Sequence, residues 1–150
     1  MKQMGLLFSC FVLCGLFAVC QTVAQNEKTE GTQSSDVSKL VGDWVGESIC
    51  VNKEKFPACH DEQVVYHVVA TAGKTDTVTI SADKIVNGKP EEMGAFDFIY
   101  DAQKQTLTSE FKTERIHIIF EFAVKGDVLE GTLSNLPEKA LVRRIKVKKK

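Results

Sequence analysis

Along residues 39–148, large apolar side chains alternate with mostly polar ones. The alternation is clearest at Phe96, Phe98 and Tyr100, and again over residues 116–124. A period of two is typical of strands that bury one face and expose the other, and no window of about eleven residues has the period of an amphipathic helix. The pattern therefore predicts little helix and eight strands, at residues 41–51, 62–72, 76–86, 94–101, 105–112, 115–124, 127–134 and 140–148.

Short turns separate these strands. Asn87-Gly88 is the strongest hairpin signal, because both central positions of a type I′ turn need positive φ, and residues 101–103, 112–114 and 125–127 are further tight connections. Parallel strands need crossovers of about a dozen residues or more, which these links cannot provide. We therefore expect an all-β fold, an eight-stranded antiparallel up-and-down barrel that closes on itself and removes exposed edges. A two-sheet sandwich is the competing arrangement.

The first 24 residues differ from the rest of the chain. Lys2 is their only charged residue, residues 5–20 form an almost unbroken apolar run, and Thr22-Val23-Ala24 place small side chains before a cut at Gln25. This order predicts a signal peptide at residues 1–24 and an exported protein, periplasmic or extracellular. A membrane anchor is disfavoured, because the run is shorter than the ~20 residues of a spanning helix.

Two further expectations concern the segment around the cut. A lipid-anchored form, cut before Cys20, is disfavoured because Val19 is larger than a lipoprotein signal normally accepts. Residues 25–38 contain one sizeable apolar residue, Val37, and no aromatic residue, which is typical of a flexible linker. The barrel domain is then expected at residues 39–150, with no spanning segment after the leader is removed.

Removing the leader changes the cysteine count. The chain has five cysteines, of which only Cys50 and Cys59 lie outside residues 1–24. Their spacing matches neither a C-x-x-C redox pair nor a common zinc site, and disulfides persist in exported proteins. We predict a structural disulfide between them.

The charge is divided unevenly. The whole chain has 19 basic and 20 acidic side chains, but six of its last eight residues are basic, which leaves an acidic body. Binding to nucleic acid or anionic lipid is one hypothesis for this tail. Ile145 and Val147 alternate with Lys146 and Lys148, however, and export separates the chain from nucleic acid. We therefore favour a last strand with a lysine-rich outer face.

One motif links the two ends of the barrel domain. Trp44 is the only tryptophan and follows Gly42 by two residues on the first strand, and Arg143 shares the inward phase of the last strand. A buried arginine can pack against an indole face. This Gly42-x-Trp44 motif with Arg143 resembles the closure of one barrel end in lipocalins (calycins), and the chain is also similar to small secreted bacterial proteins of about this size. The resemblance implies a barrel that carries a small apolar molecule.

Neither metal binding nor catalysis has a clear sequence signature. His60 and Glu62 lie close together, but His67 and His117 belong to separate strands, so we expect no metal site. The sequence contains no G-x-S-x-G, P-loop, G-x-G-x-x-G or H-E-x-x-H motif. We therefore expect a protein that is not an enzyme and needs no cofactor.

The predicted interior is rich in large side chains, which leaves little room for a cavity. Eight strands enclose a space that side chains can fill or that holds one small ligand. We expect a mostly filled barrel with at most a shallow pocket at one mouth, near the Cys50–Cys59 loop or residues 87–94. Its candidate lining is aromatic: Phe96, Phe98, Tyr100, Phe111, Phe120 and Phe122.

Two functions fit these expectations. The first is a secreted or periplasmic binding module that holds a small hydrophobic molecule at the barrel mouth. The alternative is a module that binds another extracytoplasmic protein, for example as an inhibitor of a protease or lysozyme.

Overall fold

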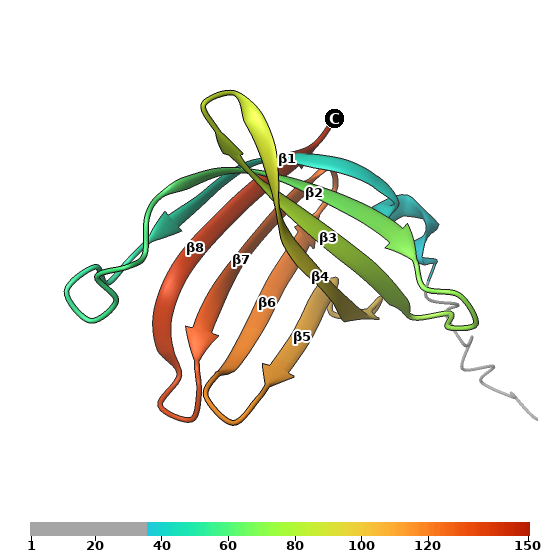
Figure 1. Cartoon of the computed structure of the whole chain (residues 1–150). Coiled ribbons are helices and arrows are strands. Elements are labelled where there is room, and N and C mark those ends of the chain that lie inside the picture. The colour runs from blue at the N-terminus through green and yellow to red at the C-terminus, as the bar shows by residue number, and fades with distance from the viewer. Residues whose placement is uncertain (1–35) are drawn as a thin grey trace, which may run out of the picture. The chain divides into compact units, whose positions relative to one another are not determined.

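The computed structural model of the chain describes residues 36–150, so the predicted signal peptide and most of the predicted linker lie outside the described residues. A short 3-10 helix, η1, precedes eight strands (Figure 1). The elements are η1 (Val37–Leu40), β1 (Gly42–Cys50), β2 (Glu62–Ala70), β3 (Thr77–Val86), β4 (Lys89–Asp101), β5 (Thr106–Lys112), β6 (His117–Lys125), β7 (Val128–Asn135) and β8 (Ala140–Lys149).

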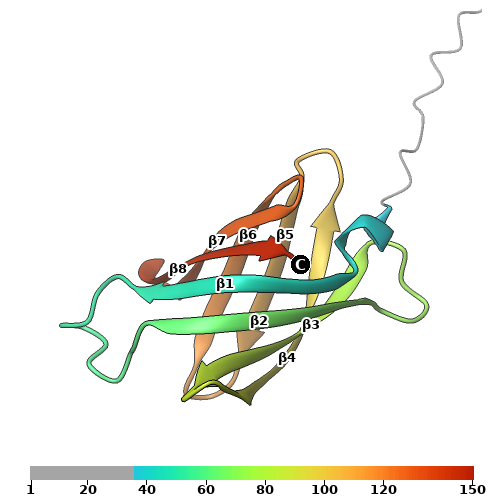
Figure 2. The same ribbon diagram turned by 90° about the horizontal axis from the view of Figure 1, so that it is seen from above.

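The strands form a closed barrel in which each pairs antiparallel with its neighbours in sequence (Figure 2). Closure comes from β1 pairing with β8, where Trp44 faces Lys149 and Cys50 faces Arg143 in register. This pairing confirms the up-and-down barrel and excludes the two-sheet sandwich. It requires Gly46, because a Cβ at this position would overlap the backbone oxygen of Lys146 on β8.

Seven of the eight strands begin and end within two residues of the predicted positions. The exception is β4, which begins at Lys89 rather than at residue 94. The β3–β4 hairpin is longer than predicted because Asn87 and Gly88, both with positive φ, make its turn directly and the strands pair up to that turn. A register shift between Ala82 and Asp83 interrupts the alternation of inward and outward side chains within this hairpin. The alternation therefore does not reveal the full length of the hairpin.

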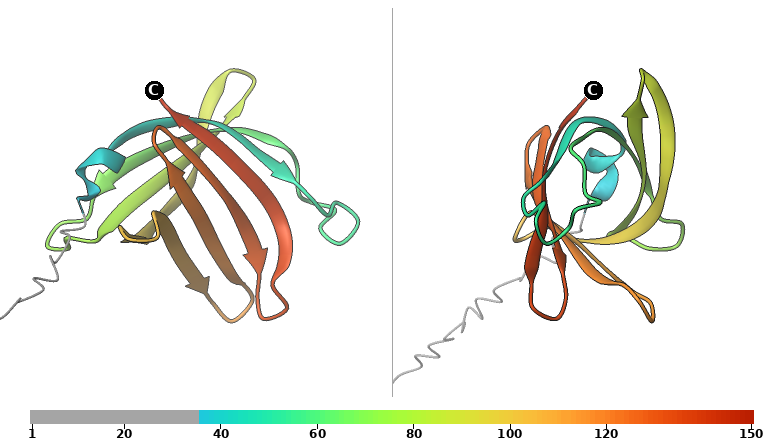
Figure 3. Two further views of the ribbon diagram at one scale, coloured as in Figure 1. Left: turned by 180° about the vertical axis from the view of Figure 1, so that it is seen from behind. Right: turned by 60° about the vertical axis from the view of Figure 1, so that its left-hand side comes forward.

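One end of the barrel is filled by η1 and the side chains beneath it. Val37 and Leu40 of η1 are buried, and Asp36 caps the helix by accepting a hydrogen bond from the backbone N–H of Ser38 at 3.0 Å. η1 therefore begins two residues before the expected start of the barrel domain, and one residue of the expected linker, Val37, reaches the core. We call this end the η1 end; Figure 3 shows it opposite the β1–β2 loop.

The opposite end holds the β1–β2 loop and the β3–β4 turn, and we call it the pocket end. Here the wall is incomplete between β4 and β5, which pair only from Ile99↔Thr108 to Asp101↔Thr106. Beyond that point the rings of Phe96 and Phe111 meet with their centroids 5.2 Å apart. Side chains rather than backbone hydrogen bonds therefore close this part of the wall.

Candidate ligand pocket

A pocket of about 220 Å³ opens inside the barrel at the pocket end. Two small inward residues, Ala82 on β3 and Gly94 on β4, create the space. They are partners in register, so no large side chain fills the interior at this point of the two strands. The lining comes from six strands and is mostly apolar: Glu62, Tyr66, Ile80, Ala82, Met93, Gly94, Phe96, Phe98, Phe120, Phe122, Leu133 and Arg143. Its position agrees with both segments expected to border a pocket.

Four phenylalanines form one wall of the pocket. Phe96 and Phe98 on β4 pack against Phe120 with ring centroids 5.6 and 5.8 Å apart, and Phe98 also lies 5.8 Å from Phe122. The rings meet at tilted or edge-to-face angles, which are favourable arrangements for aromatic pairs. The wall is thus a connected and preformed apolar surface.

The polar corner of the pocket is an ion pair between the first residue of β2 and an inward residue of β8. Arg143 donates from Nη1 to a carboxylate oxygen of Glu62 at 2.9 Å and to the Ser48 hydroxyl at 3.1 Å. The Arg143 and Glu62 side chains are 16% and 21% exposed, so the pair is largely shielded from water. Each charge has its partner beside it, as a shielded charge requires.

Tyr66 adds a hydroxyl to this corner of the pocket. Burial raises the pKa of Tyr66; the Arg143 charge acts in the opposite direction and the Glu62 charge adds to the rise. The phenol therefore stays neutral and can both donate and accept a hydrogen bond.

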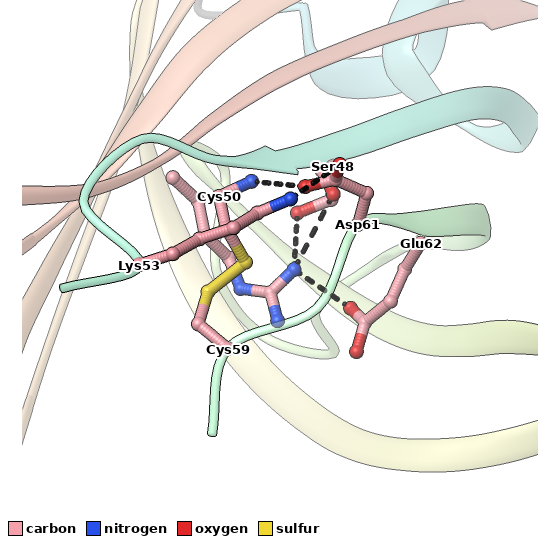
Figure 4. The surroundings of a disulfide bond; sticks show 7 residues. Ser48, Cys50, Lys53, Cys59, Asp61 and Glu62 are labelled. Carbon is pink, nitrogen blue, oxygen red and sulfur yellow. Dashed lines mark hydrogen bonds and ion pairs between the residues drawn. A yellow bond between two sulfur atoms is a disulfide. The ribbon is translucent and has the colours of Figure 1, made fainter. Parts of the chain in front are cut away.

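The β1–β2 loop is fixed beside this corner by the Cys50–Cys59 disulfide (Figure 4). Asp61 strengthens the attachment: its carboxylate accepts from the backbone N–H of Cys50 at 2.9 Å and from Lys53 at 2.8 Å. These two contacts, with that to Lys53 the stronger, lower the pKa of Asp61. Because Glu62 follows Asp61 directly, the disulfide and this carboxylate together position the ion pair.

The six aromatic residues expected at the pocket divide into two groups. Phe96, Phe98, Phe120 and Phe122 line it. Tyr100 lies deeper, toward the η1 end, where its ring packs under the Lys39 ammonium group at 5.1 Å. Phe111 stands at the β4–β5 gap against Phe96 rather than among the lining residues.

The expected contact between Trp44 and Arg143 is wrong. In the β1–β8 register, Trp44 faces Lys149, while Arg143 faces Cys50 at the other end of the strand. Lys149 takes the expected place: its ammonium group lies 5.7 Å from the centre of the Trp44 ring and donates to the Lys39 carbonyl at 2.7 Å. Trp44 itself is fully buried and donates from Nε1 to the Leu40 carbonyl at 2.8 Å.

Sequence reasoning missed the partner of Arg143. The sequence pattern indicates Glu62 only as the start of a strand or as a metal ligand, although this residue shares the inward phase of Val64 and Tyr66 on β2. That shared phase was the signal that could have identified it. The small inward pair Ala82 and Gly94 was also missed, because the predicted interior rests on large side chains alone.

The three histidines lie apart from the pocket lining. His67 bridges Asp43 at 2.7 Å and Asp83 at 3.2 Å, and His117 contacts Glu110 at 2.6 Å. Among residues 36–150, no group of three or more histidine, cysteine or acidic side chains is arranged to hold a metal ion. Within the same range, no helix has the length and apolar character to cross a membrane.

The fold and the pocket define a closed eight-stranded β-barrel with one filled end and one end that carries a pocket. A point mutant of the fluorescent protein UnaG is similar in structure, with a TM-score of 0.51 and 14% sequence identity over 76% of this chain and 98% of that chain. Secretory abundant heat soluble protein 4 from Ramazzottius varieornatus gives a TM-score of 0.47 and 17% identity, over 73% and 94% of the two chains. At this identity, the likeness to UnaG shows the fold alone.

No protein-family model matches the sequence, and no curated protein sequence matches it. The lipocalin resemblance of the Gly42-x-Trp44 motif is therefore supported at the level of the eight-stranded barrel and no further.

Proposed function

We propose that this protein is an exported, non-enzymatic binding module that holds one small, mostly apolar molecule in the pocket at the pocket end. The observation that carries the proposal is the preformed aromatic wall of Phe96, Phe98, Phe120 and Phe122 around open space. Ligand sites combine such apolar walls with a few placed polar groups, and Arg143 with Glu62 supplies those groups.

The volume of the pocket limits the size of the ligand. At about 220 Å³ it lies below the range of roughly 300–1,000 Å³ that is usual for drug-sized ligands. An apolar cavity of about 150 Å³ can hold one benzene molecule. The pocket therefore suits a single ring with a short substituent, or a short aliphatic chain.

Export is supported by the leader-like segment of residues 1–24 and by the Cys50–Cys59 disulfide, since disulfides persist outside the reducing cytosol. Mass spectrometry of protein purified from its own host would test this part directly. We expect a chain that begins near Gln25, with Cys50 and Cys59 oxidised. A mature protein that retains residues 1–24 would overturn it.

Binding can be tested with toluene as a minimal apolar probe, followed by amide chemical shifts. Ala82→Phe places a ring in the pocket and should abolish the shifts. Ala95→Phe is the matched control, because Ala95 lies one register position away but is exposed on the outer face. Binding that survives Ala82→Phe, or no binding by the wild type, would overturn the proposal.

A further inference from the structure

The polar corner of the pocket carries no net charge. Among the lining residues, Glu62, Tyr66 and Arg143 are the only ones whose side chains contain oxygen or nitrogen. The Tyr66 phenol is neutral, and the Arg143 charge is balanced by Glu62 at 2.9 Å. A ligand in this pocket therefore meets a dipolar pair rather than an isolated cation.

Both partners keep hydrogen-bonding capacity beyond their mutual contact. The contacts of Arg143 to Ser48 and Glu62 all leave from Nη1, and the Glu62 contact uses Oε2. Nη2 and Nε of Arg143 are further donors, and Oε1 of Glu62 is a further acceptor. The corner thus offers a donor and an acceptor side by side.

A charged head group fits this corner poorly. A ligand carboxylate could reach the other N–H groups of Arg143, but it would also face the Glu62 carboxylate, and two anions shielded from water would then share one guanidinium charge. A ligand ammonium group would meet the same difficulty with Arg143. Leaving a buried charge unpaired is strongly unfavourable, whereas a neutral group with a donor and an acceptor pairs with both residues and disturbs neither.

We propose that the pocket selects an uncharged amphipathic molecule, with an apolar body against the phenylalanine wall and a head group that both donates and accepts, such as a primary carboxamide or a hydroxyl. The carbonyl or hydroxyl oxygen accepts from Arg143, and the N–H or O–H donates to Glu62. This inference rests on the proposed function, since it specifies the ligand of the same pocket.

The test compares three probes that share one body: 3-phenylpropanamide, 3-phenylpropanoate and 3-phenylpropylammonium at neutral pH. Their dissociation constants are measured by calorimetry, and their binding position by amide chemical shifts. The wild type should bind the carboxamide at least tenfold more tightly than either ion. Glu62→Gln frees the Arg143 charge and should tighten binding of the carboxylate at least tenfold. Arg143→Gln should favour the ammonium probe instead.

Glu121→Gln is the matched control, because Glu121 is exposed on the outer face of β6 between two pocket residues, Phe120 and Phe122. It should leave all three affinities unchanged. Tighter binding of the carboxylate by the wild type, or an unchanged preference in Glu62→Gln, would overturn this inference while toluene binding still upheld the proposed function. Failure of toluene and all three probes to bind would overturn both.

Discussion

The two ends of the barrel use a basic residue of β8 in opposite ways. At the η1 end, Lys149 lies over the Trp44 ring and donates to a backbone carbonyl, so its charge is accommodated without a carboxylate. At the pocket end, Arg143 is paired with Glu62. At the η1 end, Lys149 and the Trp44 ring together fill the interior. At the pocket end, the Arg143–Glu62 ion pair borders open space, which the small residues Ala82 and Gly94 also line.

The same contrast extends to the apolar side chains. Trp44, Leu40, Leu107 and Leu129 are fully buried and leave the η1 end solid. At the pocket end, Phe96 and Phe120 are only partly buried although they belong to the same interior face. We therefore expect the η1 end to contribute most of the packing energy that stabilises the fold, and the pocket end to bind the ligand.

The largest expected effect is at the η1 end. Trp44→Ala should lower the free energy of unfolding by about 4 kcal/mol, because it removes a fully buried side chain and leaves a cavity. Phe120→Ala at the pocket end should cost about 2 kcal/mol, because its ring already borders open space. Urea unfolding of both variants measures the difference. Equal losses would contradict the division of roles.

The next largest effect is expected from removal of the disulfide, which should destabilise the pocket end more than the η1 end. Replacing Cys50 and Cys59 together by alanine should cost about 2.5 kcal/mol, the chain-entropy value for a loop of this length. Hydrogen exchange should show the loss of protection first in the β1–β2 loop and at the start of β2, with η1 less affected. Reduced wild-type protein serves as the control. Loss of protection that begins at η1 would contradict the assignment of the disulfide to the pocket end.

The period of two was enough to predict the strands, since it reports which face of each strand is buried. It could not choose between Arg143 and Lys149 as the partner of Trp44, because both share the inward phase of β8. That choice depends on the register of β1 against β8, which is set by the whole closed barrel and leaves Trp44 and Arg143 at opposite ends.

The pocket was hard to predict for a similar reason. The large inward residues of the sequence predict the filled η1 end well, but they do not reveal the space beside Ala82 and Gly94. These two small residues are separated by a hairpin in the sequence and become partners through the β3–β4 pairing. Space in a barrel depends on where small residues meet, and their meeting requires the register. Phe111 shows the same limit, because its place at the β4–β5 gap follows from the point at which that pairing ends.

A smaller effect, of opposite sign, is expected from Tyr100. Its hydroxyl is buried and has no hydrogen-bond partner among residues 36–150. Tyr100→Phe removes this unsatisfied group and should raise the free energy of unfolding by about 1 kcal/mol. Tyr66→Phe is the paired variant at the pocket end, where we expect a smaller change in stability. Destabilisation by Tyr100→Phe in thermal unfolding would show that the hydroxyl does have a favourable contact.

The smallest expected effect lies on the outer face and depends on pH. The hydrogen bond to Asp43, with a smaller contribution from Asp83, raises the pKa of His67 above its usual 6.5. A raised pKa in the folded state means that protonation favours folding, so this contribution is complete below pH 6.5 and disappears as the pH rises through the higher folded value. Because His67 is 41% exposed, solvent screening limits the effect to about 0.5 kcal/mol.

His67→Gln should therefore be less stable than the wild type at pH 5.5 and equal to it at pH 9. His60→Gln, in the exposed β1–β2 loop, is the control for replacing a histidine by glutamine. A stability difference that grows with pH would have the wrong sign and would show that His67 acts through packing rather than through its charge.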